Sequence, residues 1–342
     1  MKAAIYSPYL DTLGGGERYV ITFAKVLSEV GWDVDIECED KSILQKMEER
    51  FGMDLSKLRV VGSVKRGDGY DLCFWLSDGS VPRLLARKNI LHFQRPFYDV
   101  DGKSLLNRMK MFSVSEIVVN SKFTKRWIDG EFTKESVVVY PPVDIDNFRP
   151  GRKENIILSV GRFSQLEQSK RQDVLVRAFK KFYDSGNRDW KMILVGGSDI
   201  GKTKFIDKLR KKSKGYPIEI VENMPFGEMR KLYAKSKIFW TASGYGIDEK
   251  KRPEKVEHFG ITVVEAMSAG CVVFGYNSGG HMESIVSGKN GYLWKDIKQL
   301  VAKTTKVVGS RNFSKISKQA ILDSKAFSYE RFKNQVLEII SK

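Results

Sequence analysis

The chain has 342 residues, 42% of them hydrophobic, and this length exceeds what one hydrophobic core usually holds, so two domains are expected. No apolar run approaches the roughly 20 residues that cross a bilayer, and the N-terminal MKAAIYSPYL lacks the apolar core of a signal peptide. Three widely spaced cysteines, Cys38, Cys73 and Cys271, favour neither a disulfide framework nor a metal site. A reducing, cytoplasmic compartment is expected.

The net charge of +17 is unevenly distributed. Residues 1–150 carry 22 basic and 22 acidic side chains, so the whole excess lies in residues 151–342. Such an excess favours an anionic partner, which could be a phosphorylated small molecule, a nucleic acid or an acidic membrane face. Plain solubility explains it equally well.

Strand and helix patterns alternate along the first part of the chain. The expected strands are 2–8, 33–39, 58–64, 70–77, 89–94, 115–121 and 136–143, and the expected helices are 17–31, 41–52, 103–112 and one that begins after Ser121. A turn-rich segment, PPVDIDNFRPG at 141–151, is the expected linker.

A second series of strands and helices follows the linker. Its expected strands are 154–163, 191–197, 218–223, 237–243 and 271–276, and its expected helices are 173–184, 202–214, 227–236, one from 261 to 269, 297–309 and 325–340. This alternation predicts an α/β protein with parallel sheets covered on both faces. We therefore expect two doubly wound, Rossmann-like domains facing across a cleft, residues 1–145 and 151–324.

The second series is organised around KVEHFGITVVEAMSAGC, residues 255–271. A loop with Glu257 and Gly260 leads into a helix that is expected to begin near Ile261 and Thr262. The first N–H groups of a helix lack intrahelical partners and lie at its positive end, which makes an anion site. Glu265, eight positions after Glu257, can face the same ligand. The alternative is a solvated loop acid and a helix-face acid.

Three other loops follow predicted strands and carry ligand-type residues. LGGGE at 13–17 brings Gly15 and Gly16 to a helix start; SVGRFSQLEQSKR at 159–171 brings Arg162 and Lys170; NSGGHMES at 277–284 brings two glycines and an acid. Arg and Lys at a strand end suit a diphosphate. Ordinary surface charge is the alternative.

Two of the three histidines, His92 and His258, fall in predicted strand-end loops. A lone histidine is more often structural than catalytic, but His92 is expected here to face the cleft. The Asp99 and Asp101 pair lies in a polar loop and does not suggest a metal site, and no other metal cluster is found.

Two stretches have the composition of membrane-contacting segments. Lys103–Phe112 mixes three basic residues with Leu, Met and Phe in the pattern of an interfacial helix. An ordinary packed helix is an equal alternative. Residues 202–214 hold seven basic residues but few apolar ones, which indicates a charged surface only.

Taken together, these motifs resemble a known family. EHFGITVVEAMSAG, SVGRF with SKRQDVLVRAF, and NSGGHMESIVSGKNGYLW resemble the retaining GT-B glycosyltransferases of family 4, and the similarity extends over nearly the whole chain. GGGER, HFG-x-x-VVE and YPP look closest to the GDP-mannose-dependent mannosyltransferases that extend lipid-linked oligosaccharides.

The resemblance implies a role for each singled-out residue. Arg162 and Lys170, with Gly15 and Gly16 nearby, would bind the donor diphosphate. The segment His258, Phe259, Gly260, Ile261 and Thr262 would bind the sugar and the distal phosphate through its backbone, and Glu265 the ribose. Glu257 and His92 would be the catalytic residues beside the transferred sugar. The last helix, about 325–342, would pack back on the first domain.

The resemblance also implies the partners. The donor would be a nucleotide sugar, a GDP-sugar rather than a UDP-sugar, with no metal or other cofactor. The acceptor would be a glycan, a lipid-linked hydroxyl or another hydroxyl. Contact with an anionic membrane at its cytoplasmic face is a separate expectation, which rests on the two stretches described above. Two stretches depart from the family pattern: the loop 244–256 and the spacing from Arg162 to Lys170 are both long.

Two alternatives remain at this stage. A nucleic-acid-binding protein would use the basic second half, although no stretch interleaves basic residues with stacking aromatics, so no nucleic-acid partner is expected. A sugar-nucleotide sensor would keep the fold without catalysis, which the intact Glu257 and Glu265 pair argues against.

Overall fold

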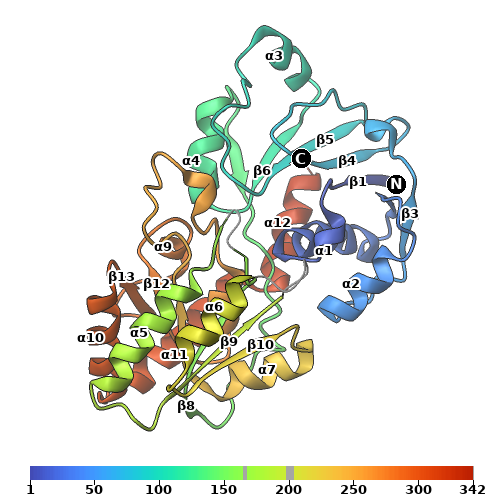
Figure 1. Ribbon diagram of the computed structural model, residues 1–342. Helices are drawn as coiled ribbons and strands as arrows, with labels where there is room; N and C mark the ends of the chain where they lie inside the picture. Colours follow the sequence, from blue (N-terminus) through green and yellow to red (C-terminus); the bar gives the residue numbers. More distant parts are fainter. Residues whose placement is uncertain (165–167, 198–203, 342) are drawn as a thin grey trace. The chain divides into compact units, whose positions relative to one another are not determined.

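The computed structural model describes residues 1–164, 168–197 and 204–341. The chain forms two compact units: unit 1 comprises Met1–Pro142 with Tyr329–Lys342, and unit 2 comprises Val143–Ser328 (Figure 1). The boundary thus falls at Pro142, at the start of the turn-rich segment. Whether these units act as acceptor and donor domains stays a prediction.

Unit 1 is built on a seven-stranded parallel sheet in the order β3-β2-β1-β4-β5-β6-β7. Its strands are β1 (Lys2–Tyr6), β2 (Asp33–Glu37), β3 (Leu58–Val61), β4 (Leu72–Leu76), β5 (Lys88–Phe93), β6 (Glu116–Val119) and β7 (Ser136–Val138). Its helices are α1 (Gly15–Glu29), α2 (Ile43–Phe51), α3 (Leu105–Met111), α4 (Lys122–Glu131) and α12 (Tyr329–Ser341), with short 3-10 turns η1 (Leu10–Thr12) and η2 (Lys65–Gly67).

Unit 2 repeats this plan with six parallel strands in the order β10-β9-β8-β11-β12-β13. They are β8 (Glu154–Val160), β9 (Lys191–Gly196), β10 (Ile218–Glu222), β11 (Ser236–Thr241), β12 (Val272–Tyr276) and β13 (Gly291–Trp294). The helices are α5 (Gln172–Asp184), α6 (Lys204–Ser213), α7 (Phe226–Lys235), α8 (Ile261–Ser268), α9 (His281–Ser284), α10 (Ile297–Val308) and α11 (Phe313–Ser324), with η3 (Pro253–Lys255) and η4 (Lys325–Phe327).

Each sheet is buried on both faces, because successive strand side chains point in opposite directions. In β1, Ala3 and Ile5 pack into one core and Ala4 into the other. In β8, Ile157 belongs to one core, and Ile156 and Leu158 to the other. The predicted fold class, two doubly wound parallel sheets, is confirmed.

Most expected elements appear with small shifts in their ends. Ser121 caps α4 as predicted, accepting a hydrogen bond from the Thr124 N–H at 3.0 Å. Helix α11 was not predicted, because its Lys- and Ser-rich sequence weakens the apolar pattern. The expected helix 202–214 begins outside the described residues, which start again at Lys204.

The terminal helix α12 belongs to unit 1, where Lys333 pairs with Glu29 of α1 at 2.8 Å. Within the part of the chain that is described, no helix is both long and apolar enough to span a membrane.

Candidate functional site

The candidate site lies in unit 2, where the strand order reverses between β8 and β11. In doubly wound sheets, ligands bind outside the carboxyl ends of the strands at this switch point. The loops after β8 (161–171), β11 (242–260) and β12 (277–280) all leave that edge. Three of the sequence-predicted segments therefore share one edge of one sheet.

A buried ion pair joins two of these loops. Lys170 Nζ lies 2.6 Å from Glu257 Oε2, and both side chains are largely buried. Burial alone raises the pKa of Glu257, but the charge of Lys170 and its hydrogen bond outweigh burial and lower the pKa to about 2. Glu257 is therefore ionised at neutral pH. The two residues were predicted as separate ligand contacts, and their direct pairing was not.

A second contact runs beside this pair. The Gln168 amide nitrogen lies 2.7 Å from His258 Nδ1. If the amide donates, Nδ1 is the acceptor and the ring proton sits on Nε2. Gln168 was missed by the sequence analysis, which offered no signal beyond its position two residues before Lys170. Residues 165–167, which precede Gln168 in the same predicted loop, lie outside the described residues.

The start of α8 requires a glycine. Gly260 precedes the helix with φ 92°, in the left-handed region that side chains disfavour. Its carbonyl accepts the Val263 N–H at 3.0 Å, while Ile261 and Thr262 stay partly exposed in the first turn. Phe259 is buried and meets Phe327 edge-on. The predicted helix start is present, and the first N–H groups of such a helix have no partner within the helix.

The glycine loop after β12 packs directly on the 257–258 backbone. The Gly280 N–H donates to the Glu257 carbonyl at 2.7 Å. A Cβ on Gly279 would lie 2.2 Å from the Glu257 carbonyl oxygen, and a Cβ on Gly280 2.3 Å from that of His258. No side chain fits at either position, so these glycines set where Glu257 stands.

The long loop 244–256 contributes an anchor to this packing. Glu249 accepts hydrogen bonds from Ser278 Oγ at 2.7 Å and from the Gly279 N–H at 2.8 Å. The loop therefore caps the glycine loop rather than extending freely. The sequence analysis noted its length but not Glu249.

Two further ionisable side chains are buried in the same unit. Glu265 accepts a hydrogen bond from the Tyr233 hydroxyl at 3.1 Å. His281 is fully buried, with Nδ1 3.0 Å from the Tyr276 carbonyl oxygen, and burial lowers its pKa. His281 is therefore neutral at pH 7, and at the lower pH where it becomes charged it adds to the lowering of the Glu257 pKa.

Arg162 lies on the same loop as Lys170, just after β8, with its side chain exposed. The Gln172 amide donates to the carbonyl oxygens of Gly161 at 3.1 Å and Arg162 at 3.0 Å. These bonds hold the turn that carries the guanidinium. Lys170, Glu257, His258 and the α8 start are thus brought together, with Arg162 on the same loop.

The structure corrects the placement of His92. It lies inside β5 rather than in a loop, is fully buried, and has Nδ1 2.9 Å from the Val118 carbonyl oxygen. Its ring stacks on Tyr19, and burial lowers its pKa to about 3. Such a side chain has no exposed surface with which to contact a sugar, because both faces of β5 are covered by the core.

The residue that meets the predicted glycine loop is Gln94, just after β5. Its amide donates to the Gly16 carbonyl at 2.9 Å. Gly15 and Gly16 open α1, and the Gly14 N–H is capped by Glu17 Oε2 at 2.7 Å. Gln94 was missed because its neighbour His92 is the more familiar catalytic type.

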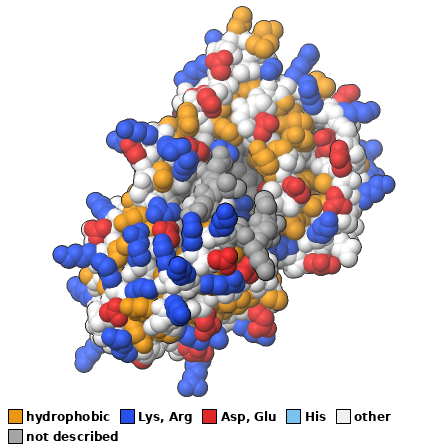
Figure 2. Space-filling view, viewed as in Figure 1, with side chains coloured by type: hydrophobic (Ala, Val, Ile, Leu, Met, Phe, Trp, Pro, Cys, Tyr) orange, Lys and Arg blue, Asp and Glu red, His pale blue; other side chains and the backbone are white. Residues whose placement is uncertain are grey.

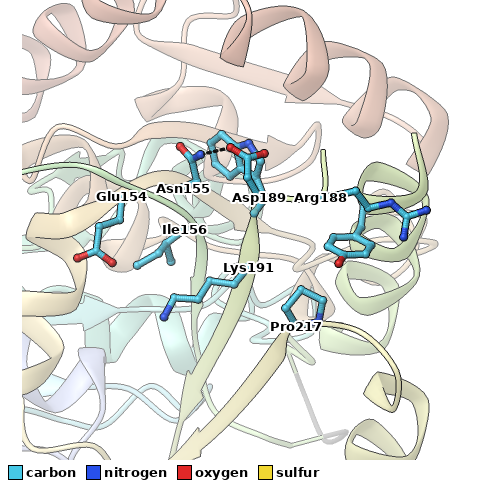
Figure 3. A pocket seen from close by; sticks show the side chains of 9 residues that line it. Glu154, Asn155, Ile156, Arg188, Asp189, Lys191 and Pro217 are labelled. Carbon is cyan, nitrogen blue, oxygen red and sulfur yellow. Dashed lines mark hydrogen bonds between the residues drawn. The ribbon is translucent and has the colours of Figure 1, made fainter. Parts of the chain in front are cut away.

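A cavity of about 330 Å³ lies elsewhere in unit 2 (Figure 3). Its walls come from the starts of β8 and β9 and from Pro217 before β10, with Asn155 hydrogen-bonded to Asp189. This is the amino edge of the sheet, opposite the candidate site, so the cavity is separate from it. Among the described residues, no group of three or more His, Cys, Asp or Glu could hold a metal ion.

Comparisons with solved structures identify the fold. The chain superposes on a glycosyltransferase from Rickettsia africae with a TM-score of 0.78 at 19% identity, covering 99% of this chain and 97% of that one. It superposes on Anabaena Alr3699/HepE, solved with UDP and glucose, with a TM-score of 0.75 at 19% identity, covering 100% and 99%. The fold is therefore GT-B, with two doubly wound units.

The family follows from sequence. The model of the family "Glycosyl transferases group 1" matches residues 143–321, and the chain belongs to this family. A curated relative from Xenopus tropicalis, GDP-Man:Man(3)GlcNAc(2)-PP-Dol alpha-1,2-mannosyltransferase, is 29% identical over 186 residues, which is 50% of this chain and 35% of the relative. The chain thus matches about a third of that relative's length.

Proposed function

We propose that this protein is a retaining glycosyltransferase that moves a hexose, mannose in particular, from a GDP-sugar to a hydroxyl of a glycan or lipid-linked acceptor. The observation that carries the proposal is the Lys170–Glu257 pair at 2.6 Å beside the start of α8. It combines a cation and helix N–H groups for a diphosphate with an ionised carboxylate for a sugar.

In this proposal the donor lies along the carboxyl edge of unit 2. Arg162 and Lys170 bind the diphosphate, together with the N–H groups of Ile261 and Thr262. Glu265 accepts hydrogen bonds from the ribose. The backbone of His258, Phe259 and Gly260 lies along the sugar and the distal phosphate. We also propose Gly15 and Gly16 as diphosphate-binding residues.

The chemistry breaks one bond and forms one. The bond from the anomeric carbon to the diphosphate oxygen breaks, and its electron pair leaves with the nucleoside diphosphate. The acceptor hydroxyl oxygen bonds to the anomeric carbon on the same face and gives its proton to the leaving phosphate. Fixed cations and helix N–H groups stabilise the charge that develops on that phosphate. No metal ion is needed for these roles.

Glu257 is proposed to position the sugar and stabilise positive charge at the anomeric carbon. Its pKa of about 2 keeps it ionised at neutral pH, so it has no proton to donate as a general acid. Its pairing with Lys170 also draws charge away from the carboxylate, which weakens it as a nucleophile.

Different observations support the proposed donor and the proposed cellular location. The name of the Xenopus tropicalis relative specifies GDP-mannose, which favours that donor here. The Anabaena structure holds UDP, so a UDP-sugar is the competing donor to test. We propose cytoplasmic action at the cytoplasmic face of a membrane, with unit 1 serving the acceptor and unit 2 the donor.

A thermal-shift panel at fixed salt tests the donor. GDP-mannose, UDP-glucose and ADP-glucose are compared, with a short DNA duplex as control. A ligand at a hundred times its Kd should stabilise the protein by about 2.7 kcal/mol. We expect this stabilisation with GDP-mannose, and we expect Arg162→Ala to abolish it.

Other outcomes of the panel change the conclusion. A shift with UDP-glucose alone would keep the transferase and change its donor. A shift with DNA alone that vanishes at high salt would favour a nucleic-acid-binding protein instead.

A further inference from the structure

Helix α3 exposes an unusual amount of apolar surface for a seven-residue helix. Leu105, Leu106, Met109 and Phe112 are 77%, 64%, 61% and 90% exposed, and none of the helix residues is buried. Figure 1 shows α3 in the connection between β5 and β6, and Figure 2 shows hydrophobic side chains gathered there. The structure therefore argues against the ordinary packed helix.

The helix is nonetheless held in a defined orientation. Ser104 caps it by accepting a hydrogen bond from the Asn107 N–H, and the Asn107 amide donates to the Asp101 carbonyl at 3.1 Å. Met111 packs against the unit 1 core. These residues fasten one side of α3, so the apolar side chains on the other side are presented outward.

The outward face has a regular composition. Leu105, Met109 and Phe112 are spaced i, i+4 and i+7, which aligns them in one stripe, and Leu106 widens it. At roughly 100° per residue, Arg108 flanks one side of this stripe and Lys110 the other. Lys103 precedes the helix, and no acidic residue occurs between 103 and 112.

We propose that α3 is a membrane-docking element that inserts Leu105, Leu106, Met109 and Phe112 into the interface of an anionic bilayer. An apolar stripe bordered by cations matches a surface that is apolar beneath a layer of negative headgroups. A second copy of the chain is a poorer partner, because a symmetric contact would bring the three cations of each helix against those of the other.

Helix α6 provides an internal contrast. It carries more basic residues than α3, but its apolar residues Phe205, Ile206 and Leu209 are buried in unit 2. It can attract an anionic surface and cannot insert into one. Charge alone therefore predicts docking through α6, whereas apolar exposure with charge predicts docking through α3.

Vesicle co-sedimentation of the full chain without nucleotide sugar tests the proposal. We expect binding to vesicles of phosphatidylcholine with phosphatidylglycerol, and at least tenfold weaker binding when Leu105, Leu106, Met109 and Phe112 are all changed to Gln. The matched control changes two exposed leucines elsewhere, Leu85→Gln and Leu322→Gln, and should bind like the unchanged protein. Unfolding midpoints should agree within about 2 °C.

The charge contribution is measured with a second pair of variants. Lys103→Gln with Arg108→Gln should weaken binding roughly fivefold per charge and flatten its salt dependence. Lys208→Gln with Lys211→Gln in α6 should have a smaller effect.

Three results would overturn the proposal: no binding to these vesicles, equal binding by the fourfold Gln variant, or dimerisation that depends on α3 without vesicle binding. Because the assay contains no donor, its failure would leave the proposed donor chemistry untouched.

Discussion

The glycine loop of unit 1, after the central strand β1, and the Gly279–Gly280 loop of unit 2, after β12, both follow parallel strands but hold different groups. Gly16 of unit 1 meets the neutral amide of Gln94. In unit 2, Gly279 packs against the backbone of Glu257 and Gly280 against that of His258. The Glu257 carboxylate is paired with Lys170. Strand order therefore determines at which edge of a sheet the loops meet. The side chains of those loops determine which charges and hydrogen-bonding groups are found at that edge.

The largest effect on stability is expected from a substitution of Lys170. Lys170→Met leaves Glu257 buried without its cation, which should lower the free energy of unfolding by about 3–5 kcal/mol. The double variant Lys170→Met/Glu257→Gln should recover a large part of this loss. Urea denaturation of the wild type, both single variants and the double variant measures the coupling, and losses that add would show that the pair carries none.

Turnover should also depend strongly on the Glu257 carboxylate. Glu257→Gln keeps the size of the side chain and removes its charge, and we expect kcat to fall about 10²–10³-fold, the loss typical of one preorganised electrostatic group. Glu228→Gln, an exposed acid on α7, is the control. Wild-type turnover in a folded Glu257→Gln protein would remove the proposed role.

The same carboxylate predicts an acid-dependent stability. Its pKa is lowered from 4.5 to about 2 in the folded chain, so the folded state binds fewer protons than the unfolded state. The resulting stabilisation, about 3 kcal/mol, is present above pH 5 and is lost as the pH falls toward 2. The free energy of unfolding should therefore fall more steeply for the wild type than for Glu257→Gln between pH 5 and 3. Parallel curves would contradict the pairing.

A smaller change in stability is expected from the close packing at Gly280 in unit 2. A Cβ at Gly280 would lie 2.5 Å from Phe259 Cα and 2.3 Å from the His258 carbonyl oxygen, so Gly280→Ala should destabilise by about 1–3 kcal/mol. A Cβ at Gly227 in α7 would have no neighbouring atom within 4 Å. Gly227→Ala should therefore be neutral or stabilising by up to about 1 kcal/mol. Thermal unfolding distinguishes them, and equal midpoints would be unexpected.

The smallest effect is expected in the unit 1 loop. A Cβ at Gly16 would approach Gln94 Oε1 to 2.2 Å, but this atom ends a flexible side chain that can move. Gly16→Ala should change stability by less than about 1 kcal/mol while raising the donor KM, because the displaced amide no longer holds the loop. Gly16→Ala/Gln94→Ala removes the crowding but also the amide, so its donor KM should rise as well. An unchanged donor KM in both variants would contradict a role of this loop in donor binding.

Local patterns in the sequence determined much of the fold. Alternating apolar residues and helix caps such as Ser121 are local signals, so they predicted most strands and helices, the parallel sheets and the start of α8 at Gly260. The same signals placed Arg162, Lys170 and Glu257 after strands. Helix α11 was missed because its pattern is diluted by polar residues.

Only the tertiary structure decided which of these residues meet. Lys170 and Glu257 are 87 positions apart, and Gln168 and His258 are 90 apart. Their contacts depend on how loops from different strands approach one another, which no local pattern encodes. The burial of His92 likewise depends on the helices that cover both faces of the sheet around β5. The sequence alone thus determined where ligand-type residues occur, and packing selected their partners, because a hydrogen bond requires an approach of about 3 Å in space.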